Sequence, residues 1–160
     1  MTGLLDKVVM VTGAARGTGR VHCQRFAEEG TDVIALDAPA VADDLRGTAR
    51  DVASRNRHCA LGVADVSDLD AMTDAVNAGV AELGRLDVIV ANAGIHLPGA
   101  PAWELDPLDW QRTLDINLTG GLAHDQGGRA ARRGPGRCHR DHQFHQRTSR
   151  DVQHRALHRE

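Results

Sequence analysis

The sequence predicts an α/β fold, a doubly wound parallel sheet with helices on both faces, over residues 1–120. Between residues 7 and 91, short apolar runs alternate with longer segments of helical period, which is typical of parallel strands joined by crossover helices. A glycine-rich turn follows the first apolar run, and the composition changes sharply near residue 120. These three observations predict one α/β portion followed by a tail of a different kind.

Four apolar runs have the length of strands: Lys7 to Thr12, Asp32 to Leu36, His58 to Val63 and Leu86 to Ala91. Four segments read as helices: Gly17 to Glu29, Val41 to Arg55, Leu69 to Leu83 and Pro107 to about Leu118. In the third of these helices, Val76, Val80 and Leu83 are spaced to lie along one face. We therefore expect the helices to cover the sheet through apolar stripes.

Residues 121–160 form a second region of different composition. They contain nine Arg and six His against four acidic residues, a formal charge of +5, whereas residues 1–120 carry −8. Their large aliphatic and aromatic side chains are only Leu122, Phe144, Val152 and Leu157, too few to offset the entropy of ordering the backbone. This region is predicted to be a disordered basic tail.

The cysteines and the apolar runs exclude several classes of protein. Cys23, Cys59 and Cys138 are odd in number and lack a Cys-x2-Cys spacing, so neither a disulfide framework nor a four-Cys metal site is expected. Neither an export signal nor a run of eighteen uncharged apolar residues occurs, so we expect no membrane span and a cytoplasmic protein.

The glycine-rich turn predicts a phosphate-binding site. It runs Thr-Gly-Ala-Ala-Arg-Gly-Thr-Gly from residue 12, directly between a predicted strand and a predicted helix. Small residues let the backbone bend and approach a pyrophosphate, whose charge the helix amides and dipole favour. Its candidate ligands are Gly13, Arg16, Gly17, Thr18 and Gly19.

A single carboxylate predicts the choice of dinucleotide. Asp37 closes the second strand 18 residues past Gly19, where it can accept hydrogen bonds from both hydroxyls of the adenosine ribose. It would repel a 2′-phosphate and so favours NAD over NADP, whereas Arg16 could pair with that phosphate. We give Asp37 more weight because it would face the discriminating hydroxyl and Ala38 adds no cation. The alternative is a hydrated carboxylate in a turn.

Four motifs in order resemble the short-chain dehydrogenase/reductase family, which has a Rossmann-like fold. They are the glycine-rich turn, Asp65-Val66, Asn92-Ala93-Gly94, and Asn117 within Leu-Asp-Ile-Asn-Leu. The resemblance implies that Asp65 and Val66 hold the adenine, and that Asn92, Ala93 and Gly94 line the adenosine side and brace the sheet. It also implies that Asn117 bends a helix and anchors the water of a catalytic proton relay.

The amino-acid sequence of residues 11–30 resembles that of the carveol dehydrogenases and the mycofactocin-associated members of this family. This resemblance covers residues 4–120. It implies NAD as the cofactor, oxidation of secondary and often terpenoid alcohols, and a small alcohol or ketone as the substrate. It further implies homo-oligomers and a peptide-derived redox carrier for the intact relatives.

The family's proton-transfer residues are missing from this chain. The family uses a Ser that holds the substrate oxygen, a Tyr that exchanges its proton, and a Lys that lowers the pKa of that Tyr. The sequence contains no Tyr, and its only Lys is Lys7. We therefore expect NAD binding without dehydrogenase turnover, in effect a truncated, non-catalytic nucleotide-binding fragment.

A change of reading frame near Gly120 would explain the tail. Reread one nucleotide later, the codons that fit residues 141–160 permit a string with a Ser pair and the start of Tyr-x3-Lys. Residues 121–128 likewise permit a family-like continuation. The hypothesis is decided by the nucleotide sequence around codon 120.

Two other functions for the tail are weighed against this reading. Cys138, His139, His142 and His145 offer zinc-type ligands, but no paired Cys frames them. Nine arginines could contact phosphates of nucleic acid, yet Phe144 is the tail's lone aromatic residue and gives no stacking platform. Metal and nucleic acid are therefore disfavoured.

Overall fold

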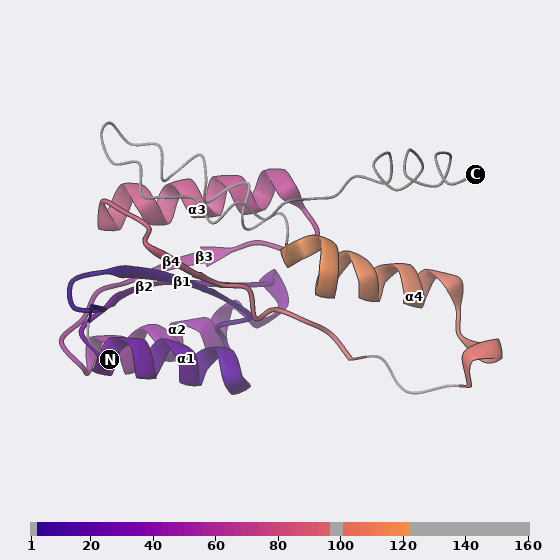
Figure 1. Ribbon diagram of the computed structural model, residues 1–160, viewed down its shortest axis with the longest axis horizontal. Helices are drawn as coiled ribbons and strands as arrows, with labels where there is room; N and C mark the ends of the chain where they lie inside the picture. Colours follow the sequence, from indigo (N-terminus) through magenta and orange to yellow (C-terminus); the bar gives the residue numbers. More distant parts are fainter. Residues whose placement is uncertain (1–2, 97–100, 122–160) are drawn as a thin grey trace, which may run out of the picture.

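Four parallel strands form one sheet in the order β3-β2-β1-β4 (Figure 1). The computed structural model describes residues 3–96 and 101–121. The strands are β1 (Val8–Thr12), β2 (Asp32–Asp37), β3 (Cys59–Val63) and β4 (Val88–Val90). The chain steps outward from β1 to β3 and then returns to the other side of β1, so the strand order reverses between β1 and β4. The predicted doubly wound parallel sheet is confirmed.

Helices cover both faces of this sheet. They are α1 (Gly17–Glu28), α2 (Ala42–Ala53), α3 (Leu69–Leu83) and α4 (Pro107–Leu114). Figure 1 shows α1 and α2 on one face and α3 on the other, while α4 lies beyond the end at which the strands finish. Every crossover therefore returns the chain to the same end of the sheet, and the carboxyl ends of the strands share one edge.

The core is divided by the period of the strands. Val8 and Met10 of β1 pack on the α3 side, whereas Val9 and Val11 pack on the side of α1 and α2. All four side chains are buried because both faces of β1 are covered. On α3, Val76 is buried while Val80 and Leu83 pack against the same cluster, which confirms the predicted stripe.

Several element boundaries differ from the predictions, most of them by one or two residues. The strand expected over Leu86 to Ala91 is reduced to β4, because only Val88, Ile89 and Val90 register with β1. The helix expected from Val41 begins at Ala42, after a 3₁₀ turn over Pro39–Val41. The helix expected to reach Leu118 changes at Asp115 into a π-helical turn, Asp115–Thr119.

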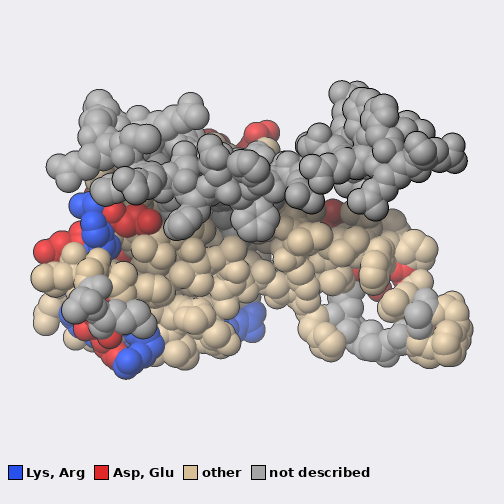
Figure 2. Space-filling view, in the orientation of Figure 1, with Lys and Arg blue, Asp and Glu red and all other residues tan. Residues whose placement is uncertain are grey.

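Oppositely charged side chains form ion pairs at the end of the sheet where the strands begin. Arg57 lies 3.0 Å from Asp32 at the start of β2, and Arg85 lies 2.6 Å from Asp87, which precedes β4. Lys7 approaches the same Asp87 at 3.7 Å. Figure 2 shows charged side chains gathered at this left-hand end. These charges are paired with one another, so the opposite end of the sheet is the better candidate for a ligand.

Several predictions concern residues outside the described ones. Residues 122–160 hold the tail, its Cys and His cluster and the stretch attributed to a changed reading frame, and they lie outside the described residues. Within the part that is described, no helix combines the length and the apolar character that a membrane crossing requires.

Candidate cofactor site

The glycine-rich turn needs glycine at three positions. Gly13 and Gly17 have φ angles of 65° and 53°, in the left-handed region that side chains disfavour. At Gly19, a Cβ atom would lie 2.0 Å from the carbonyl oxygen of Gly13. The first turn of α1 therefore packs directly onto the backbone of the loop.

The amino end of α1 is open to an anion. Asp68 caps α3 by accepting a hydrogen bond from the Ala71 amide, and Asp106 caps α4 in the same way through Leu108. Helix α1 begins after Arg16 without a side-chain cap. Arg16, Gly17 and Thr18 are exposed there. Free amides at a helix start favour a phosphate group.

Asn92 fastens the loop after β4 to this turn. The Thr12 hydroxyl oxygen accepts hydrogen bonds from the backbone amides of Asn92, at 3.2 Å, and Ala93, at 3.1 Å. In return, Asn92 Nδ2 donates to the carbonyl oxygens of Thr12, at 2.9 Å, and Gly13, at 3.4 Å. Two motifs separated by about 80 residues in the sequence thus form one rigid unit at the point where the strand order reverses.

Thr48 of α2 supports the turn from the other side, and the sequence reasoning missed it. Its hydroxyl donates a 2.8 Å hydrogen bond to the Ala14 carbonyl oxygen, and both residues are buried. The signal available was a hydroxyl on the buried stripe of α2, between Leu45 and Val52. A polar group there needs a partner, because burying it unpaired is costly.

Asp37 touches the turn directly. One carboxylate oxygen accepts a 2.7 Å hydrogen bond from the Ala15 amide, and the other accepts a 2.8 Å bond from the Ala38 amide. The carboxylate is thus held beside the phosphate-binding loop at the end of β2. Each oxygen can still accept a second hydrogen bond, which is what a ribose with two hydroxyls requires.

Arg16 lies next to Asp37's partner Ala15, but its guanidinium is directed elsewhere. Arg16 Nε lies 3.3 Å from a carboxylate oxygen of Asp44 in the first turn of α2. Both side chains are more than half exposed. The sequence made Arg16 a candidate cofactor ligand that could pair with a 2′-phosphate, with Asp37 given more weight. The structure places an acidic partner against Arg16.

Asp65 and Val66 follow β3 at the same edge of the sheet. The Asp65 carboxylate accepts hydrogen bonds from the Ser67 hydroxyl, at 2.7 Å, and the Ser67 amide, at 2.9 Å. These bonds to the hydroxyl and the amide lower the pKa of Asp65, against a smaller desolvation effect that raises it. Val66 is buried, and a Cβ atom on Gly120 would lie 2.9 Å from its Cγ2 atom. The absence of a side chain at Gly120 therefore allows the π-helical turn to approach the loop.

Asn117 ties that π-helical turn to the loop after β4. Its Oδ1 accepts a 2.7 Å hydrogen bond from the Ile95 amide, and its Nδ2 donates a 3.0 Å bond to the Ile95 carbonyl. A Cβ atom on Gly94 would lie 3.2 Å from the same Oδ1. Asn117 lies within the π-helical turn that begins at Asp115, and π turns recur at functional sites.

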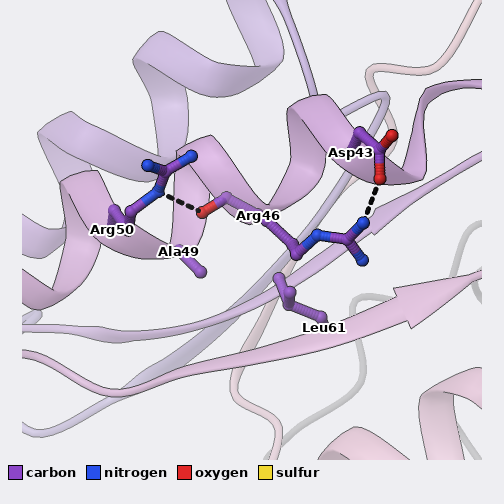
Figure 3. Close-up of a pocket in the computed structure, with 5 residues that line it drawn as sticks. All are labelled: Asp43, Arg46, Ala49, Arg50 and Leu61. Atoms are coloured by element: carbon purple, nitrogen blue, oxygen red, sulfur yellow. Dashed lines mark hydrogen bonds and ion pairs between the residues drawn. The ribbon is translucent and has the colours of Figure 1, made fainter.

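The predicted residues therefore meet at one edge, and two hollows on the described surface lie away from these residues. One of them, of about 600 Å³, lies between α2 and the edge strand β3, and Figure 3 shows the residues that line it. It is lined by Asp43, Arg46, Ala49, Arg50 and Leu61, with Arg46 paired to Asp43. None of the predicted ligands lines it, so it has no part in the candidate site.

The geometry fits the pyrophosphate and adenosine parts of a dinucleotide. Glycines leave room at the turn, an uncapped helix end presents amides, and Asp37 presents a carboxylate beside them. Among the described residues, no group of three or more His, Cys, Asp or Glu side chains could hold a metal ion. This edge is therefore organised around backbone amides and a carboxylate.

Known proteins resemble this chain in sequence. Residues 7–126 match the family model for short chain dehydrogenases. The chain is 42% identical over 130 residues to a (−)-trans-carveol dehydrogenase of Rhodococcus erythropolis, covering 75% of this chain and 47% of that protein. It is 43% identical over 116 residues to a cis-4-hydroxycyclohexanecarboxylate dehydrogenase of Sinomonas cyclohexanicum, covering 72% and 45% of the two chains.

A solved structure agrees with the sequence relatives. The carveol dehydrogenase of Mycobacterium avium in complex with NAD superposes with a TM-score of 0.75 at 39% identity, covering 79% of this chain and 50% of that one. The present chain thus spans about half the length of the relatives it matches. From the match over residues 7–126 and these identities, the chain belongs to the short-chain dehydrogenase family.

Proposed function

We propose that the chain binds NAD at the carboxyl edge of the sheet. The observation that carries this proposal is the position of the Asp37 carboxylate, 2.7 Å from the Ala15 amide inside the glycine-rich turn. The turn residues Gly13, Arg16, Gly17, Thr18 and Gly19 would hold the pyrophosphate, and Asp37 the adenosine ribose. Asp65 and Val66 would flank the adenine, with Asn92, Ala93 and Gly94 beside it.

The intact form of this protein is proposed to oxidise secondary alcohols. The names of its relatives, a carveol dehydrogenase and a hydroxycyclohexanecarboxylate dehydrogenase, support a cyclic alcohol or the matching ketone as substrate. NAD, when bound, accepts the hydride in such a reaction. Within this chain, Asn117 would anchor the water of the proton relay. We further propose a cytoplasmic location, which the free thiols of Cys23 and Cys59 suit.

The present sequence is proposed to bind NAD without catalysing the reaction. Proton transfer by a positioned side chain contributes about 10²- to 10⁴-fold to the rate, and the sequence offers no Tyr for it. The domain division proposed here is an NAD-binding portion over residues 1–120 and an aberrant, Arg- and His-rich tail over 121–160. We propose that the tail results from a changed reading frame near Gly120.

Calorimetric titration with NAD tests the binding proposal. We expect Asp37→Ala to lower NAD affinity by roughly 10- to 100-fold, since hydrogen bonds to a charged group contribute about 1.5–3 kcal/mol. The control is Asp74→Ala, an exposed carboxylate on α3 away from the site. Equal affinities for the wild type and Asp37→Ala would contradict the assignment of the ribose ligand.

An activity assay and resequencing test the rest. Purified protein with NAD and a panel of cyclic secondary alcohols should show no turnover at ordinary enzyme rates. A gene whose frame is restored after codon 120 should encode Ser, Tyr and Lys at the family spacing and should be active. Turnover by the chain as given would refute the inactive assignment, and a nucleotide sequence without that alternative frame would refute the frameshift.

A further inference from the structure

We propose that Asp44 is a second determinant of cofactor choice, which acts by holding Arg16 away from the adenosine ribose. This inference rests on the proposed NAD site. Asp37 by itself explains a preference for NAD over NADP only if no nearby cation can pair with the 2′-phosphate of NADP. Arg16 is such a cation, because a guanidinium pairs readily with phosphate oxygens.

Arg16 stands close to the ribose ligand. It directly follows Ala15, whose amide donates to Asp37 at 2.7 Å. Its side chain is two-thirds exposed and leaves from the start of α1, so rotation about its own bonds could bring it over the carboxylate edge of the site. A phosphate on the ribose hydroxyl held by Asp37 would then lie within its reach.

Asp44 holds the Arg16 guanidinium away from the proposed position of the adenosine ribose. Its carboxylate lies 3.3 Å from Arg16 Nε and belongs to the first turn of α2, where a negative charge is also favoured by the helix dipole. The pair directs the guanidinium toward α2. A 2′-phosphate would have to displace Asp44 to recruit Arg16, and it would meet two carboxylates instead of one.

The neighbouring Asp43 provides a matched comparison within the same helical turn. Its carboxylate pairs with Arg46, and both side chains line the hollow against β3 shown in Figure 3. Asp43 and Asp44 therefore carry the same charge on adjacent residues but engage different arginines. Neutralising either one changes the charge of the turn equally, whereas only Asp44→Asn frees Arg16.

The experiment compares dissociation constants for NAD and NADP by calorimetry on the full chain. Asp44→Asn should raise the affinity for NADP relative to NAD by about 2- to 5-fold, the range that an exposed ion pair can supply. Asp43→Asn should change this ratio by clearly less. The double variant Asp44→Asn with Arg16→Gln should return the ratio to that of the wild type, because the freed cation is gone.

Each outcome is decisive. Equal gains in Asp43→Asn and Asp44→Asn would show a general charge effect and overturn the inference, as would a gain that persists without Arg16. An unchanged ratio in Asp44→Asn would also overturn it while leaving NAD binding intact. A wild-type chain that binds no NAD would instead contradict the proposed function itself. The replaced side chains are at least half exposed, so the variants should fold alike.

Discussion

The buried hydroxyl of Thr48 donates a 2.8 Å hydrogen bond to the carbonyl oxygen of Ala14, joining α2 to the glycine-rich turn. Ala14 is itself fully buried, and its amide donates to the Leu36 carbonyl of β2. The turn is thus fixed on both sides of this residue. A helix that makes no contact with the proposed phosphate can therefore control the loop that would bind it.

Replacing this hydroxyl should weaken both the fold and the binding of NAD. In Thr48→Val the shape is kept but the Ala14 carbonyl loses its partner, which should lower the free energy of unfolding by about 1–3 kcal/mol. NAD affinity, measured well below the melting temperature, should also fall. Thr48→Ser should restore both quantities, since it retains the donor.

Thr73 provides a control for the general effect of removing a threonine hydroxyl. Thr73 on α3 also donates a 2.8 Å hydrogen bond to a carbonyl, that of Leu69, within its own helix and exposed to solvent. Thr73→Val should leave NAD affinity unchanged in the same titration. If Thr48→Val binds NAD as the wild type does, Thr48 is only a structural residue.

Gly19→Ala should disrupt the turn by steric overlap. The added methyl group would lie 2.0 Å from the Gly13 carbonyl oxygen and 2.7 Å from Asn92 Nδ2, and both belong to the rigid unit described above. Because a backbone atom cannot move aside easily, we expect a loss of about 3 kcal/mol in thermal or urea unfolding. Gly121→Ala is the control, as no described atom comes within 4 Å of its added Cβ. A Gly19→Ala protein as stable as the wild type would contradict the close packing.

The ion pair between α1 and α2 should contribute to stability only above acidic pH. Arg20 donates to Asp51 at 2.7 Å, and this hydrogen bond, assisted by one from Gln24, lowers the pKa of Asp51. A carboxylate whose folded pKa is depressed stabilises the fold above its unfolded value, about 3.9, and loses that contribution as the pH falls through the folded pKa.

Asp51→Asn should therefore be less stable than the wild type at pH 7, by about 0.2–1 kcal/mol for a partly exposed pair. The difference should shrink below pH 4 and vanish when the wild-type carboxylate is protonated. Urea unfolding at a series of pH values measures this. Asp74→Asn on α3 serves as the reference, and a difference between wild type and Asp51→Asn that stays constant from pH 7 to pH 2 would exclude the assignment.

Two cysteines should be unreactive while the chain is folded. Burial raises the pKa of Cys23 to about 12, and burial with the nearby Glu82 charge raises the pKa of Cys59 to about 12. Since only the thiolate attacks, labelling at pH 8 with a disulfide reagent should be slow. In a Cys138→Ser background both thiols should react rapidly only after denaturation. Rapid labelling of the folded protein would show that this part of the core is open.

The local patterns of the sequence were sufficient for the strands, the helices and the glycine-rich turn. Val8 to Val11 is an uninterrupted apolar run because β1 is covered on both faces, and the stripe through Val76 on α3 follows helical period. These features depend on neighbours a few residues away in the sequence, so they can be predicted from the sequence alone. The boundaries of β4 could not be predicted from local patterns, because the length of β4 is set by its register with β1.

The contacts that organise the candidate site depended on tertiary structure. Asn92 reaches Thr12 across 80 residues, Thr48 reaches Ala14 across 34, and Asp44 reaches Arg16 only after α1 and α2 are placed side by side. The sequence determined which residue types stand at the ends of the strands. The parallel crossovers decided which backbone groups these residues bind and which carboxylate pairs with Arg16. They did so because they bring every strand end to one edge of the sheet.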